Sequence, residues 1–83
     1  NLNHNDIGDE GAIAIANSDK LPKLKSLSMF GNVIGDEGAK AFAESPNSKR
    51  LIKLDLYKNQ ISATGNKTIT ESEMLKNCEE LEI

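Results

Sequence analysis

The chain has 83 residues and a formal net charge of −3, with its Lys and Arg side chains scattered along the sequence. Proteins that bind nucleic acid usually carry a stripe of basic side chains, so we expect no nucleic-acid partner here. No apolar run approaches the ~20 residues that cross a bilayer, so we expect no membrane-spanning segment. The single cysteine excludes an internal disulfide and favours a reducing compartment, which predicts a cytoplasmic protein.

The sequence repeats at an offset of 27 residues, and asparagine, glycine and leucine-like positions all keep this register. The asparagines and glycines are Asn5, Asn32, Asn59, Gly11, Gly38 and Gly65. A fixed period of this length indicates stacked units that bury their apolar faces against one another. The expected organisation is one domain over 1–83, with a partial repeat 1–23, repeats 24–50 and 51–77, and the start of a further repeat at 78–83.

Each repeat is expected to contain a short strand. In the second unit, Leu27 and Met29 alternate with polar neighbours, as in a strand with one buried face. Cys78 shares the register of Leu24 and Leu51, so we expect it to be buried as a small substitute for leucine. The strands are predicted near 24–29, 51–56 and 78–83.

A helix follows each strand after a turn. Ala39, Phe42 and Ala43 keep the i, i+3, i+4 spacing of a helix with one buried side. The Ser-Pro-Asn sequence at 45–47 ends that helix and returns the chain to the next strand. The residues before the three predicted helices suit N-caps, and they are Gly8, Gly35 and Ser62.

The asparagines and glycines in register have predicted structural roles. Each asparagine lies where the chain leaves a strand, so its amide can satisfy backbone groups of the turn and form a ladder between repeats. Each glycine falls in the first turn of a helix, where a side chain would collide with the neighbouring repeat. The repetition of these asparagines and glycines therefore needs no functional site to explain it.

Two acidic pairs, Asp9–Glu10 and Asp36–Glu37, are the candidates for metal or acid–base chemistry. Both pairs fall in the first turn of a predicted helix. Each negative charge there interacts favourably with the positive end of the helix dipole and stabilises the helix by ~0.3–1 kcal/mol. The third repeat has Ala63–Thr64 instead. We favour the structural interpretation and expect neither a metal nor a cofactor.

Residues for catalysis are scarce. His4 is the only histidine, placed at the surface beside a strand, and Cys78 is the only cysteine. The glycines at 35–38 lack the lysine and hydroxyl residue of a phosphate-binding loop. We therefore expect no catalytic residue and no enzyme activity.

A binding surface has better support. Strand positions between the buried leucines point outward, and the register places Phe30 beside Tyr57. Adjacent parallel strands lie ~4.8 Å apart, so the two rings could stack. Two interpretations stay open: an interface hot spot, or aromatic cover where the sheet meets its loops. The candidate partner-binding residues are Ser28, Phe30, Lys53, Asp55, Tyr57 and Lys58.

The pattern L-x-x-L-x-L-x-x-N-x-I-x-x-x-G, seen from Leu24 to Gly38 with Met29 at the third leucine position, resembles the leucine-rich repeat of the ribonuclease-inhibitor-like subtype. This resemblance implies an α/β solenoid, a right-handed β/α horseshoe with parallel strands on the concave face and helices on the convex face. It also implies a protein–protein interaction scaffold that binds a protein partner on the concave face. Because neither end resembles a natural terminus, we interpret the chain as an internal fragment of a longer repeat protein.

Two other functions stay open. Uncapped ends with open strand edges and exposed leucines favour an architectural segment or a homo-oligomer. Regulation of a small GTPase, known in one branch of the resembled family, needs a positioned arginine, and the only arginine is Arg50 in a loop. Secreted bacterial effectors also belong to that family, so the host cytosol is the alternative location.

Overall fold

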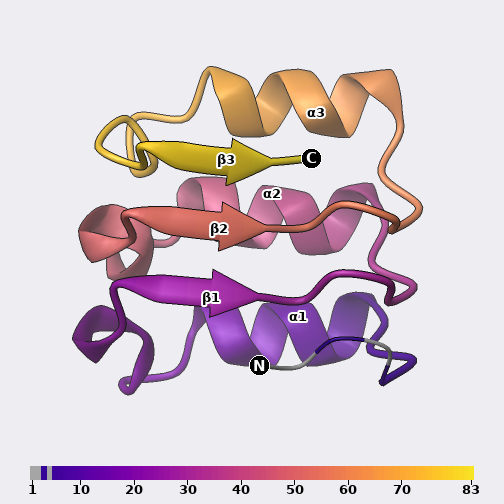
Figure 1. Cartoon of the computed structure of the whole chain (residues 1–83), viewed down its shortest axis with the longest axis horizontal. Helices are drawn as coiled ribbons and strands as arrows, with labels where there is room; N and C mark the ends of the chain where they lie inside the picture. Colours follow the sequence, from indigo (N-terminus) through magenta and orange to yellow (C-terminus); the bar gives the residue numbers. More distant parts are fainter. Residues whose placement is uncertain (1–2, 4) are drawn as a thin grey trace.

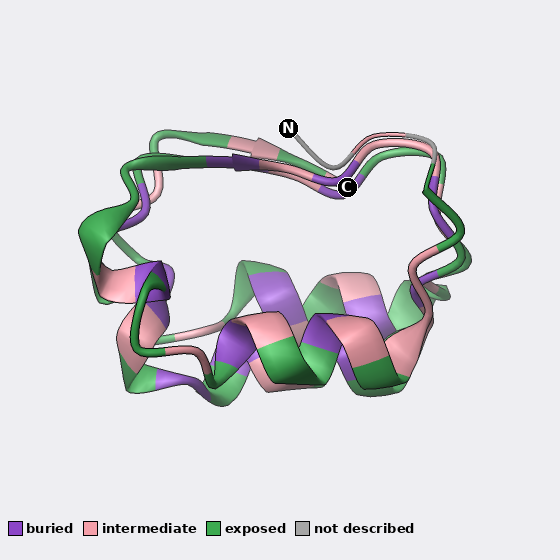
Figure 2. Cartoon of the chain, turned by 90° about the horizontal axis from the view of Figure 1, so that it is seen from below, coloured by how far each residue is buried: buried purple, intermediate pink, exposed green. Residues whose placement is uncertain are grey.

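Helices and strands alternate along the chain in the computed structural model, which describes residue 3 and residues 5–83. The elements are α1 (Asp9–Ala16), η1 (Leu21–Lys23), β1 (Ser26–Ser28), α2 (Asp36–Glu44), η2 (Pro46–Arg50), β2 (Lys53–Asp55), α3 (Ala63–Thr70) and β3 (Glu80–Glu82), where η marks a 3₁₀ helix. The strands form one parallel sheet in the order β1-β2-β3 (Figure 1). The α-helices lie side by side along one face of this sheet (Figure 2). This is the predicted parallel α/β arrangement.

The register of the sheet equals the period of the sequence. Leu27 pairs with Leu54, and Leu54 pairs with Leu81, so each step across the sheet is one 27-residue repeat. The strands have three residues each and are shorter than predicted. Bonding between repeats nevertheless continues past the strands, since Met29 N donates to Asp55 O at 2.8 Å. The turn segments therefore hold the repeats together along with the strands.

The core fills the space between the sheet and the helices. Leu54, Ile34 and Phe42 are fully buried, and Phe42 comes from the helical spacing predicted for α2. Burying each side chain of this size contributes ~1.5–3 kcal/mol to folding. Packing across the two layers is therefore the main source of stability of the stack.

Burial within one register depends on the neighbours of each repeat. Leu51 is 1% exposed because described repeats lie on both sides of it, whereas Leu24 is 40% exposed. Cys78 is only half-buried. The prediction that Cys78 is a buried substitute for leucine is therefore wrong, because described residues cover it on one side only.

Asparagine side chains join consecutive repeats at the turns that follow the strands. Asn32 Oδ1 accepts hydrogen bonds from Asn5 N at 2.8 Å and Ile7 N at 3.0 Å, both in the preceding repeat. Asn59 repeats this arrangement, accepting from Ile34 N at 2.9 Å, while its Nδ2 donates to carbonyls at the strand ends of both repeats. The predicted asparagine ladder is confirmed.

Aspartate side chains join the repeats at the starts of the helices. Asp9 Oδ1 accepts from Gly35 N at 2.7 Å and Gly38 N at 3.0 Å. Asp36 accepts from both Ser62 N, at 2.8 Å, and Ser62 Oγ, at 2.5 Å. Both carboxylates lie in the first turn of their own helix as predicted, but their bonds go to the start of the next helix. Ser62 occupies the N-cap of α3 without a side-chain cap bond, because its hydroxyl donates to Asp36.

Serine side chains join the repeats at the opposite ends of the helices. Ser45 Oγ donates to Ala16 O at 2.6 Å, and Ser72 Oγ donates to Ala43 O at 2.5 Å. Helix carbonyls in the last turn have no partner within their own helix. The hydroxyl of the next repeat therefore satisfies a group that the helix leaves unpaired.

The glycine in the first turn of α2 is required by close packing, as predicted. A Cβ on Gly38 would lie 2.9 Å from both Ala12 Cβ and Asp9 Oδ1 of the preceding repeat, and 2.6 Å from Ile34 Cγ2. We expect Gly38→Ala to lower the free energy of unfolding by ~1–3 kcal/mol, even though alanine is the better helix former by ~1 kcal/mol. Urea unfolding measures the difference. Lys40→Ala, at an exposed position of the same helix, is the control, and equal stability of Gly38→Ala and wild type would contradict the packing argument.

The Asp36 bonds predict a pH dependence. Hydrogen bonds from the hydroxyl and the backbone of Ser62 lower the pKa of Asp36 in the folded state. A lowered carboxylate pKa stabilises the fold above the unfolded pKa, and this stabilisation is lost as the pH falls through the folded pKa. The stability difference between wild type and Asp36→Asn should therefore be present at pH 7 and shrink below about pH 4.

Thermal unfolding from pH 7 to pH 2 measures this difference. Ser62→Ala removes the donor hydroxyl, so it should weaken the same pH dependence without changing the carboxylate. A constant difference between wild type and Asp36→Asn across that range would show that the bonds do not depend on the charge.

Candidate protein-binding surface

The sheet face that points away from the helices carries the predicted outward positions. In each strand, the middle residue is the more buried and its neighbours lie toward solvent, most clearly in β2, where Leu54 is buried between Lys53 and Asp55. The pairing register aligns these outward positions in rows across the sheet. The sequence prediction of which residues face outward is confirmed.

Phe30 and Tyr57 lie next to each other directly after β1 and β2. Their ring centroids are 6.1 Å apart and the ring planes meet at 33°. Tyr57 is 49% exposed, and Phe30 is half-buried. The predicted adjacency is confirmed in a tilted geometry, within the ~4.5–7 Å separation at which aromatic pairs attract each other.

The backbone beneath the aromatic pair is fixed by hydrogen bonds. Phe30 N donates to Asn3 Oδ1 at 2.7 Å, and Ser28 Oγ donates to the same oxygen at 2.9 Å. Tyr57 N donates to Asp55 Oδ1 at 3.0 Å. Since the backbone is held before any partner arrives, binding here loses little conformational entropy.

Lys58 adds a contact that the sequence analysis missed. Its backbone has a φ of 62°, in the left-handed region that few side-chain-bearing residues adopt, and Gly31 at the same register has a φ of 76°. This turn places Lys58 Nζ 5.7 Å from the centroid of the Tyr57 ring, a cation–π distance. The glycine at the equivalent position was the only sequence signal for such a turn.

The charged residues of the face are arranged in two ways. Lys53 Nζ lies 3.7 Å from Glu80 Oε2, and both side chains are largely exposed. Asp55 and Glu82 pair in register on β2 and β3, so two carboxylates occupy neighbouring positions. The 27-residue register alone already aligns both pairs, and the structure adds the ion pair between Lys53 and Glu80.

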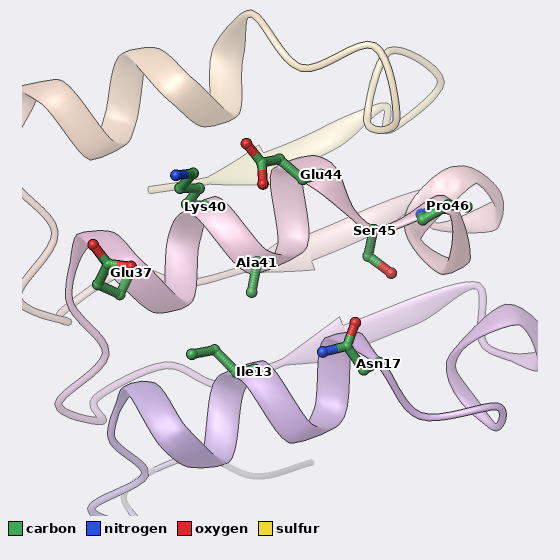
Figure 3. Close-up of a pocket in the computed structure, with 8 residues that line it drawn as sticks. All are labelled: Ile13, Asn17, Glu37, Lys40, Ala41, Glu44, Ser45 and Pro46. Carbon is green, nitrogen blue, oxygen red and sulfur yellow. The ribbon is translucent and has the colours of Figure 1, made fainter.

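A hollow that the sequence did not predict lies on the helical side of the molecule. It is a groove of about 430 Å³ between α1 and α2, with Ile13 and Ala41 facing each other across it (Figure 3). Lys40 and Glu44 extend from α2 on the side away from Ile13. Lys40 and Glu44 therefore do not converge on the space between Ile13 and Ala41 (Figure 3).

Groups for catalysis are few in the described part of the chain. Burial raises the pKa of the Cys78 thiol, which favours the protonated and less nucleophilic form. Residues 3 and 5–83 contain no group of three or more His, Cys, Asp or Glu side chains arranged to hold a metal ion. His4 lies outside the described residues. Arg50 is exposed at the end of η2.

The helices are also too short and too polar to cross a membrane, as far as the structure describes them.

Comparison with known proteins supports the class that the fold defines, an α/β protein built from stacked repeats. The family model described as Leucine Rich repeat matches residues 1–16 and 20–43. These segments contain α1, η1, β1 and most of α2. No curated protein matches the chain significantly. The match supports the leucine-rich repeat assignment made from the sequence pattern.

Proposed function

We propose that the chain is a protein-interaction scaffold, part of a larger leucine-rich repeat protein of the ribonuclease-inhibitor-like subtype. In this proposal the repeats form a horseshoe-shaped solenoid in the cytoplasm or in the cytosol of a host. The sheet face with Phe30 and Tyr57 is its concave surface and binds another protein without catalysis. The observation that carries the proposal is the exposed aromatic pair on a backbone already fixed by hydrogen bonds.

The composition of the surface supports this role. Aromatic residues are enriched at the centres of protein interfaces, where they contribute most of the binding energy. Ser28, Lys53, Asp55 and Lys58 surround the pair and would form the polar rim that adjusts specificity and association rate. Leucine-rich repeats in general mediate protein–protein interactions, in agreement with the matched segments.

A random peptide library displayed on phage tests the binding surface without a known partner. Peptides selected on the wild type should bind Phe30→Ala/Tyr57→Ala at least tenfold more weakly, because truncation of an interface hot spot costs ~2 kcal/mol or more. Ile13→Ala, in the groove on the helical side, is the control and should leave affinity unchanged. Peptides that keep their affinity for the double variant would contradict the proposal, provided that the variant unfolds with the same cooperativity as the wild type.

Self-association is the second candidate function, and one observation favours it. Ile61 of repeat 51–77, and Leu81 and Ile83 of the segment 78–83 that follows it, are only half-buried, although they pack against the core. At the other end, Leu24 is 40% exposed. Apolar surface of this kind can be buried by head-to-tail stacking of copies, which forms open assemblies when the contact does not close.

The solution mass across a range of concentrations separates the two functions. The scaffold proposal expects a monomer for both the wild type and the Phe30→Ala/Tyr57→Ala variant. Concentration-dependent assembly that the variant leaves unchanged would favour stacking through the end faces. Assembly lost in the variant would instead identify the aromatic pair as a self-association surface.

A further inference from the structure

The cations on the outer face of the sheet already have partners. Lys53 is paired with Glu80 at 3.7 Å, and Lys58 lies over the ring of Tyr57 at 5.7 Å. The carboxylate of Glu80 offsets the charge of Lys53, whereas the contact with the Tyr57 ring positions Lys58 without neutralising its charge. Lys53 is therefore less available to an anionic partner than the sequence suggests.

The carboxylates beside the aromatic pair have no such compensation. Asp55 and Glu82 are direct neighbours across β2 and β3, and neighbouring parallel strands are ~4.8 Å apart. The ion pairs of the described residues join Lys53 to Glu80 and Lys76 to Glu73, so no cation of this part of the chain pairs with either carboxylate. Like charges in opposed positions destabilise a sheet. This arrangement leaves two neighbouring carboxylates without an ion-pair partner among the described residues.

The negative charge and the aromatic pair form one surface. Asp55 and Tyr57 are two residues apart, and Tyr57 N donates to Asp55 Oδ1 at 3.0 Å. This bond fixes the Asp55 carboxylate at the backbone of Tyr57. A partner that contacts the exposed ring of Tyr57 therefore meets Asp55 as well.

We propose that the protein bound by this face presents a basic side chain, an arginine above all, to Asp55 and Glu82, together with an apolar side chain that packs on Phe30 and Tyr57. This inference rests on the proposed function, because it names the kind of partner that the same surface accepts. An arginine fits better than a lysine, since its planar guanidinium bonds to carboxylates through two donors and stacks on aromatic rings. The net charge of −3 also steers basic partners toward the chain.

The test uses the peptides selected from the phage library on the wild-type chain. We expect them to be enriched in arginine next to an apolar residue. A synthetic copy of one such peptide with arginine replaced by glutamine should bind the wild type at least tenfold more weakly. This difference should disappear on Asp55→Asn/Glu82→Gln, which removes both charges and keeps the shapes of the side chains.

A matched variant separates local recognition from the change in net charge. Glu10→Gln/Glu44→Gln removes the same number of charges at exposed positions of α1 and α2. On this variant the preference for arginine should persist. Loss of the preference on both variants would mean that only the net charge attracts the peptides, and it would overturn the inference.

The remaining outcomes distinguish this inference from the proposed function. Peptides without arginine enrichment that fail on Phe30→Ala/Tyr57→Ala would overturn the basic partner and leave the binding surface intact. Arginine-containing peptides that bind equally to the wild type and Asp55→Asn/Glu82→Gln would do the same. Peptides that keep their affinity for the aromatic double variant would overturn the proposed function, and the inference with it.

Discussion

The fold depends on hydrogen bonds that a side chain of one repeat makes to the backbone of an adjacent repeat. Strands of three residues supply few ladder bonds, and the turns and helix ends around them leave many backbone groups unpaired. Asn32, Asp9 and Ser45 satisfy such groups at three corners of the repeat. A buried donor or acceptor without a partner costs ~1–3 kcal/mol. These corners therefore help to fix the register of 27 residues, together with the packing of the apolar core.

This arrangement also explains why the outer face of the sheet is available for binding. Backbone satisfaction and apolar burial both take place between the sheet and the helices or within the turns, so the outward side chains carry little of the stability. Tyr57 can be about half-exposed because Phe42, Leu54 and Ile34 already fill the core. The same division allows two carboxylates, Asp55 and Glu82, to stay opposite each other in the sheet. Their repulsion is a modest cost that a basic partner would remove.

The sequence predicts the parts of the structure that follow from its period. The pairing of Leu27 with Leu54, the asparagine ladder and the adjacency of Phe30 and Tyr57 all require only that equivalent residues lie side by side. The destinations of Asp9 and Ser45 could not be predicted in this way, because a carboxylate in a first helical turn suits its own dipole equally well. The partial exposure of Cys78 was also missed, since period alone does not tell how many neighbours cover a repeat. The position of the binding surface was predictable from the sequence. Its charge was less so, because it depends on which lysines form ion pairs within the chain.

The third repeat departs from the others on one side of its helix. Ala12 and Ala16 of α1 are fully buried, and they belong to the side that receives α2, since Ala12 Cβ lies next to Gly38. The equivalent residues of α3 are Asn66 and Thr70, and Ala63 replaces the aspartate that bonds to the next helix. Asn66 Oδ1 is buried without a hydrogen-bond partner among the described residues. A further helix of the α2 type would therefore meet larger side chains here and no capping carboxylate. Whatever covers the outer side of α3 must donate a hydrogen bond to this amide oxygen. The helices α2 and α3 meet a different requirement, because the starts of these helices donate backbone N–H groups to the aspartate of the preceding helix.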